Sequence, residues 1–257
     1  MKHPGFRRIA NAGTLLLLSS PGFALAAQPN PITKPDDLLT RPIALVVALA
    51  LVSILPFAFM TVTAFVKIST VLQIVRGAIG AQNVPSNTVI MALAGALTLL
   101  AMAPVGSRIA DRAAPLFKEG KANDTSALVS GLIKATREPM RAFLKANSSK
   151  REHERFYQIA RAARPKAERV KVGRDDLVIV IPSFVVTELL EAFALGFALY
   201  LPFLVIDLVV SNVLLALGMQ MMNPTQVSLP FKLLLFVAID GWGLLAQALV
   251  TGYKPGF

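Results

Sequence analysis

The 257-residue sequence contains no cysteine and only two histidines. Without cysteine, disulfides and thiolate metal sites are excluded. His3 and His153 lie too far apart in the sequence to indicate a ligand pair, so we expect neither a metal nor a cofactor. Charged residues are also scarce, at 16%, whereas 54% of the residues are hydrophobic and the mean hydropathy is +0.61. This composition is typical of a membrane protein.

Motifs that carry catalysis are absent as well. The sequence has no G-x-x-x-x-G-K-[ST] phosphate-binding loop, no G-x-S-x-G nucleophile elbow and no H-E-x-x-H zinc helix. The sequence therefore gives no indication of the hydrolases and metalloproteases that are built on these motifs. We expect no enzymatic activity and name no catalytic residue.

Positive charge is abundant but local. The net charge is +11, and residues 107–177 hold 17 of the 26 Lys and Arg against 9 of the 15 Asp and Glu. This basic segment has few aromatic residues and no Arg-Gly or zinc-finger pattern, so the sequence does not favour nucleic-acid binding. Its apolar residues recur at i, i+3 and i+4, which predicts a small helical domain.

The first 26 residues have the layout of a secretory signal peptide. A basic start is followed by a short apolar run and by Ala-Leu-Ala at residues 24–26, after which we expect cleavage. An uncleaved interfacial segment stays an alternative because the apolar run is short. Residues 27–42 are rich in proline and polar side chains and are predicted to be a linker.

Four apolar stretches follow, and each is close to the ~20 residues that a helix needs to cross a bilayer. They are residues 43–66, 88–105, 192–217 and 229–251. We predict an all-α fold made of membrane-type helical hairpins, the first in residues 43–106 and the second, with a Met-rich loop, in residues 178–257. The basic segment lies between them.

Two sequence features predict opposite sides of the membrane for the basic segment. A cleaved signal peptide starts the mature chain outside, which puts residues 107–177 in the periplasm. The positive-inside rule indicates the opposite side, but it weakens for loops longer than ~60 residues. We therefore expect a periplasmic segment.

Two carboxylates within the apolar stretches, Asp207 and Asp240, allow two interpretations. Intramembrane carboxylates often carry protons, which suggests a proton-coupled transporter. Alternatively one of them pairs with Lys67 or Lys232 and joins helices together. Structural pairing is favoured because nothing else in the sequence marks a proton relay.

Two blocks resemble a known family. Residues 56–105 begin PFAFMTVTAFVKIS, and residues 182–242 contain LYLPFLVIDLVVSNVLLALGM. In order and spacing they are similar to the FliP/SctR family, the export-gate proteins of flagella and of type III secretion injectisomes. The second block is more similar to the injectisome SctR branch than to the flagellar FliP branch, which stays the alternative. The resemblance gives no motif in residues 107–177.

The resemblance implies a pore-forming subunit of a protein export gate. Such a subunit assembles as a pentamer, in a ring or helical oligomer, around a path for unfolded secreted proteins. Its implied partners are small two-helix subunits of the SctS/FliQ kind and larger multi-helix subunits of the SctT/FliR kind. The implied location is the bacterial inner membrane or, for the flagellar branch, the basal body.

Three of the eight methionines fall within four positions of the stretch LGMQMMN, residues 217–223. Methionine is unbranched and adaptable, so a ring of these side chains from several copies can close around a passing polypeptide. With the resemblance, we expect Met219, Met221 and Met222 to be a pore gasket, with Gln220 making it wetter. Ordinary core packing is the alternative.

The resemblance also implies that polar residues of the apolar helices are candidates for contacts between subunits. They are Lys67, Arg76, Glu188, Glu191, Asp207, Asn212, Lys232 and Asp240. One departure from the family pattern is Thr187-Glu188-Leu189-Leu190-Glu191, where the family usually has Ser-Glu-Leu-Lys or similar before Ala-Phe, which puts in doubt a charge pair that uses that lysine. The small residues Ala92, Gly95 and Ala96 are expected to permit close helix approach.

Overall fold

The structure, a computed structural model, describes residues 42–81, 84–118 and 125–257. Helices are the regular elements of these residues, and no strand occurs among them, which confirms the all-α prediction. The elements are α1 (Pro42–Val62), α2 (Phe65–Ile79), α3 (Asn87–Lys118), α4 (Thr125–Ala146), α5 (Lys150–Ala162), η3 (Lys166–Lys171), α6 (Leu177–Ala216), α7 (Pro224–Ala238) and α8 (Gly241–Thr251). The predicted signal peptide, and the linker up to residue 41, lie outside the described residues.

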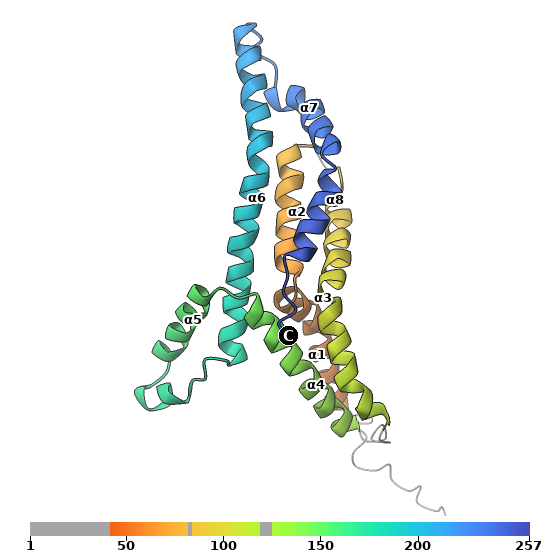
Figure 1. Cartoon of the computed structure of the whole chain (residues 1–257), viewed down its shortest axis with the longest axis vertical. Helices are drawn as coiled ribbons and strands as arrows, with labels where there is room; N and C mark the ends of the chain where they lie inside the picture. Colours follow the sequence, from red (N-terminus) through yellow and green to blue (C-terminus); the bar gives the residue numbers. More distant parts are fainter. Residues whose placement is uncertain (1–41, 82–83, 119–124) are drawn as a thin grey trace, which may run out of the picture. The chain divides into compact units, whose positions relative to one another are not determined.

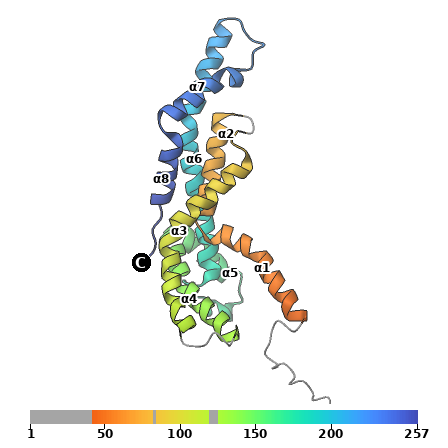
Figure 2. The ribbon, with the colours of Figure 1, turned by 90° about the vertical axis from the view of Figure 1, so that its right-hand side faces the viewer.

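The chain divides into two units, Met1–Leu49 and Ala50–Phe257. In the second unit, α2 packs against α6, α3 and α7 (Figures 1 and 2). Nine of the fifteen residues of α2 are buried, among them Ile68, Leu72 and Val75. These side chains join residues of α3, α6, α7 and α8 in the main hydrophobic core, so α2 is the helix around which the others gather.

The close approach of α2 and α6 depends on Gly196. A Cβ atom built at Gly196 lies 2.5 Å from Ile74 Cδ1, well inside van der Waals contact. Gly95 was expected to permit such an approach, but the same test finds no atom within 4 Å of it. Gly95 therefore faces open space in the described part of the single chain.

Two pairs of helices are sharply bent. Val52–Val62 of α1 meets α2 at 70°, and α7 meets α8 at 58°. At the second bend Asp240 adopts the left-handed conformation with φ +50°, which costs a residue with a side chain on the order of 1 kcal/mol. The apolar stretches 43–66 and 229–251 are therefore not continuous straight helices, since each contains a break.

By length and composition, Asn87–Phe117 and Leu177–Ala216 are able to cross a membrane, and there are up to four spans if each bent pair counts as one. The apolar helices thus fit the predicted membrane-type fold. The 40 residues of α6 correspond to about 60 Å at a rise of 1.5 Å per residue. A hydrocarbon core is only ~30 Å thick, so much of α6 lies outside any bilayer core that it crosses.

The described residues of the basic segment are mostly helical, as predicted, but they share a core with neighbouring helices. Helix α3 runs through the first residues of the segment, α4 packs on α3 and α6, and α5 packs on α6. Phe143 and Leu144 of α4 form a second core cluster with Val105, Val180 and Phe184. Residues 107–177 are therefore anchored to α3 and α6 through this cluster.

Candidate functional site

One polar cluster within the apolar helices joins Asp207 of α6 to two residues of α7. Lys232 Nζ lies 2.6 Å from Asp207 Oδ2, and Ser228 Oγ donates to Asp207 Oδ1 at 2.5 Å. The Lys232 side chain is only 3% exposed. Both oxygens of the Asp207 carboxylate therefore hold a partner, and one of them is a lysine considered for this role from the sequence.

Lys232 also reaches the end of α2. Its Nζ donates to the Ala78 carbonyl oxygen at 3.1 Å, close to where Gly80 ends the helix in the left-handed conformation with φ +77°. The last carbonyls of a helix lack partners within the helix, and positive charge is favourable there. Lys232 thus connects α7, α6 and the C-terminal end of α2.

A second cluster lies near the first turn of α2. Lys67 Nζ lies 2.6 Å from Glu191 Oε2 and 3.2 Å from Glu188 Oε1, although this longer contact lacks hydrogen-bond geometry. Glu188 is fully buried, whereas the Glu191 side chain is 53% exposed. One ammonium group therefore serves two carboxylates of α6. Lys67 of α2 supplies the positive charge beside Glu191.

Tyr253, which follows α8, completes the second cluster and was not expected from the sequence. Its hydroxyl forms hydrogen bonds with Glu188 and with the Ala64 carbonyl oxygen, the latter at 3.2 Å. Lys67 Nζ lies 4.6 Å from the centre of its ring, within range of a cation–π interaction. A single tyrosine near the end of a chain has no periodicity or motif around it, so no sequence pattern identifies this role.

Three of the eight polar residues predicted for contacts between subunits do not join either cluster. Arg76, Asn212 and Asp240 form no ion pair and no side-chain hydrogen bond with any residue that the structure describes. Asn212 and Asp240 are exposed, and Arg76 is half-buried in the last turn of α2. Asp207 and Asp240, the two carboxylates of the proton-transport hypothesis, thus have different surroundings, one paired and one open.

The methionine loop begins where α6 stops. Gly218 adopts the left-handed conformation with φ +72°, and the Met219 amide donates to the Leu214 carbonyl oxygen at 2.9 Å. This pattern of a left-handed glycine and a backward hydrogen bond is a Schellman ending of a helix. On the other side, the Asn223 side chain accepts from the Thr225 amide at 3.0 Å and caps α7. Both ends of the loop are thereby fixed.

The methionine side chains themselves are uncovered. Met219, Met221 and Met222 are 42%, 101% and 43% exposed, and Gln220 is exposed as well. Buried methionine in a core has little contact with water. In the single chain these three side chains therefore do not fill the core, and they remain available for another surface.

Four acidic residues of the basic segment form ion pairs, namely Glu138, Glu152, Glu154 and Asp175. Glu152 is fully buried and lies between Arg151 and Arg155, at 3.1 and 2.8 Å. Lys145 Nζ lies 2.7 Å from Asp175 Oδ1, and the hydrogen bond from Lys145 lowers the pKa of Asp175. The Lys145–Asp175 pair connects α4 to the turn that precedes α6.

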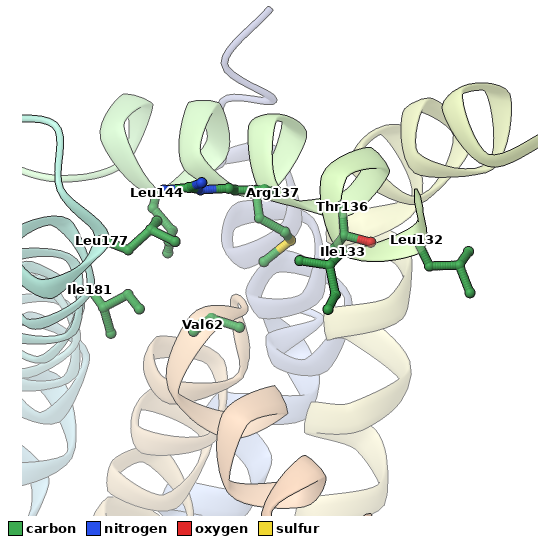
Figure 3. A pocket seen from close by; sticks show the side chains of 9 residues that line it. Val62, Leu132, Ile133, Thr136, Arg137, Leu144, Leu177 and Ile181 are labelled. Atoms are coloured by element: carbon green, nitrogen blue, oxygen red, sulfur yellow. The ribbon is translucent and has the colours of Figure 1, made fainter. Parts of the chain in front are cut away.

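A cavity of about 560 Å³ opens between α4, the last residue of α1 and the first turns of α6 (Figure 3). Its walls are mostly aliphatic, and Thr136 and Arg137 of α4 are its polar residues. The lining residues include no carboxylate, histidine or cysteine that could act as a general base or metal ligand beside the Thr136 hydroxyl. The cavity therefore gives no support to catalysis.

Comparison with known proteins identifies relatives along most of the chain. The FliP family model matches residues 48–249. The hypersensitivity response secretion protein HrcR of Ralstonia nicotianae is 42% identical over 211 residues, which are 82% of this chain and 96% of the relative. The Yop proteins translocation protein R of Yersinia pestis is 40% identical over 226 residues, with 86% and 99% covered. The virulence protein YscR of Salmonella typhimurium is 39% identical over 223 residues, with 87% and 100% covered. The chain therefore belongs to the FliP family, as the two sequence blocks predicted.

Proposed function

We propose that this protein is a pore-forming subunit of a type III secretion export gate in the bacterial inner membrane, where it forms part of a conduit for unfolded proteins. Membership of the FliP family supports this function. The names of its relatives describe hypersensitivity response secretion, translocation of Yop proteins and virulence, which favour the injectisome branch over the flagellar one. These names describe secretion rather than a chemical reaction, so we infer a conduit and not an enzyme.

The observation that carries the proposal is the exposed methionine loop. Met219, Met221 and Met222 project from a loop whose two ends are fixed by helix caps, so their position is set while their side chains stay adaptable. In a ring of copies such side chains close the conduit when it is empty and yield to a passing chain. Gln220 adds a polar group to the same ring.

A ring requires several copies, and we infer a pentamer joined by SctS/FliQ-like and SctT/FliR-like subunits. Large apolar side chains along α6 support an assembly, because Phe193, Phe197 and Val205 are 59%, 64% and 56% exposed. Exposed apolar surface of this extent marks contact with protein or lipid. Arg76 and Asp240 have no ion-pair partner in the described part of the chain, so they are available for polar contacts between subunits.

A proton-coupled transporter using Asp207 and Asp240 is the competing function. The pairing of Asp207 speaks against it, because Lys232 and Ser228 occupy both carboxylate oxygens. Asp240 lies exposed at the start of α8, with no ion-pair or side-chain hydrogen-bond partner among the described residues. A relay needs connected groups that exchange protons. We therefore assign Asp207 to joining helices.

The experiment that tests the export-gate function is a mass measurement on protein purified in mild detergent. We expect a closed oligomer of several copies, alone or together with the smaller subunits. A protein that stays monomeric when it is co-expressed with those subunits contradicts the proposal.

A further inference from the structure

We propose that residues 252–257, the C-terminal segment after α8, act as a clasp that holds the basic segment and the bend between α1 and α2 in one fixed arrangement. This inference concerns the conformation of the single chain and does not depend on the proposed function. The C-terminus lies beside α3 and α4 in both views of the ribbon (Figures 1 and 2). Three sets of contacts hold the segment there.

The first contact is a pair of hydrogen bonds with Asn147, directly after α4. Asn147 Nδ2 donates to the Lys254 carbonyl oxygen at 2.8 Å, and the Lys254 amide donates to Asn147 Oδ1 at 3.0 Å. The side-chain amide thus satisfies both backbone groups of one clasp residue, as a neighbouring strand does. Only the backbone of Lys254 takes part, so its side chain is free to be changed.

The second contact fixes the end of the clasp. Gly256 has φ +84°, and a Cβ atom at this position overlaps the Ala142 carbonyl group, so the backbone lies directly against α4. The Arg108 guanidinium carbon lies 3.7 Å from the centre of the Phe257 ring, a cation–π distance. The clasp thereby touches α3 and α4 over its last two residues.

The third contact connects the clasp to the bend. The Tyr253 ring stacks on Phe143 of α4 at 5.9 Å between centroids. Its hydroxyl bonds with Glu188 of α6 and with the carbonyl oxygen of Ala64, which lies in the break between α1 and α2. The Ala64 carbonyl oxygen also accepts the first backbone hydrogen bond of α2, from the Ile68 amide at 3.3 Å. Tyr253 is therefore a second donor to this oxygen, and it connects the start of α2 to α6 and α4.

Consequently the position of the basic segment and the geometry of the α1–α2 bend are linked through one short stretch of chain. Releasing the clasp removes the Tyr253 hydroxyl from the Ala64 carbonyl and also frees the end of α4. The helices keep their hydrophobic cores, so the expected result is local loosening and not unfolding.

The test is hydrogen exchange measured by mass spectrometry on the full-length protein. Asn147→Ala removes both hydrogen bonds to the clasp, and Lys254→Ala is its control because the backbone groups of residue 254 remain. We expect Asn147→Ala to speed exchange roughly fivefold to tenfold in peptides covering residues 62–66 and 252–257, the effect of losing one or two hydrogen bonds. Lys254→Ala should exchange like the parent.

A second variant keeps the test decisive if Asn147→Ala fails to fold. Lys254→Pro removes the clasp amide that donates to Asn147 and leaves α4 unchanged. We expect the same faster exchange at residues 62–66. If exchange becomes faster at residues 252–257 but stays unchanged at residues 62–66, the proposed link between the clasp and the bend is wrong. Equal effects of Lys254→Ala and Lys254→Pro overturn the role of the backbone pairing with Asn147.

Discussion

Lys232 Nζ and Asp207 Oδ2 lie 2.6 Å apart, and the same lysine donates to the carbonyl oxygen of Ala78. This ion pair connects α7, α6 and α2 in surroundings where the lysine has almost no access to water. Removing one member of a buried pair leaves the other as an uncompensated charge, which costs more than the pair itself contributes.

Asp207→Asn is therefore expected to destabilise the protein by about 3–5 kcal/mol, because Lys232 loses its counter-ion. Assembly into the complex, measured on native gels, should fail or fall sharply. Asp240→Asn is the matched control for stability, since Asp240 is exposed and has no ion-pair partner among the described residues, and the free energy of unfolding of this variant should match that of the parent. Asp207→Asn complexes that assemble fully but transport nothing indicate a proton relay instead.

Replacing Met219, Met221 and Met222 together with Ala should leave assembly intact and make the closed gate leak. The side chains are exposed in the single chain, so their loss opens no core cavity, which otherwise costs ~2–5 kcal/mol for each buried methionine. Ion leak in cells that carry assembled complexes measures the effect. Gln220→Met is the companion variant and should tighten the seal. A triple variant that assembles and stays as tight as the parent rules out the gasket.

Gly196→Ala should destabilise the protein by about 1–3 kcal/mol, because the new methyl group meets Ile74 across the α2–α6 contact. Gly95→Ala is the control within α3, where the added methyl group meets no atom within 4 Å. Thermal unfolding of both variants in detergent gives the comparison. If Gly196→Ala is as stable as Gly95→Ala, α2 and α6 do not pack as closely as described.

A cysteine at Ser130 reports the side of the membrane on which the basic segment lies. Ser130 is an exposed residue of α4, and the parent chain has no cysteine to react in the background. We expect Ser130→Cys to be labelled by a membrane-impermeant thiol reagent in intact spheroplasts, as a periplasmic segment requires. Labelling that begins only after lysis indicates a cytoplasmic segment and an uncleaved amino terminus.

The Lys145–Asp175 pair should give the fold a small dependence on pH. The hydrogen bond from Lys145 lowers the pKa of Asp175 below its ordinary value of 3.8, so the pair stabilises the fold above this pH. That stability is lost as the pH falls through the lowered folded-state pKa. Asp175→Asn should therefore lose less than about 1 kcal/mol near pH 7, and the difference from the parent should close in acid. Unfolding curves across pH 2.5–7 that differ equally throughout contradict this assignment.

Much of the fold was accessible from the sequence. Apolar stretches of about 20 residues identified the helical regions, and the two quoted blocks identified the family, since these signals are local. The breaks at Thr63–Ala64 and at Asp240 were not predicted. At Asp240 the chain turns from α7, which packs on α6, into α8, which packs on α3. Hydropathy averaged over a window does not register a single residue with an unusual backbone conformation.

The polar clusters were visible in the sequence in part for the same reason. Charged residues within apolar stretches stand out, so Lys67, Asp207 and Lys232 were named as candidates for contacts between subunits, and the structure gives each of them a partner within the chain. Which partner each one takes depends on how the helices approach one another. Tyr253 and Asn147 have ordinary surroundings in the sequence, and only the path of the chain after α8 brings them to their contacts.

Helix α2 is fastened to α6 near both of its ends, by Lys67 at the first turn and by Lys232 beyond the last. With Gly196 closing the gap between the two fastenings, neither helix is free to slide along or rotate about the other. We therefore expect the two helices to move as one rigid unit. In the proposed conduit, opening should then involve tilting of this unit as a whole and movement of the methionine loop at the end of α6, where no buried charge pair has to break.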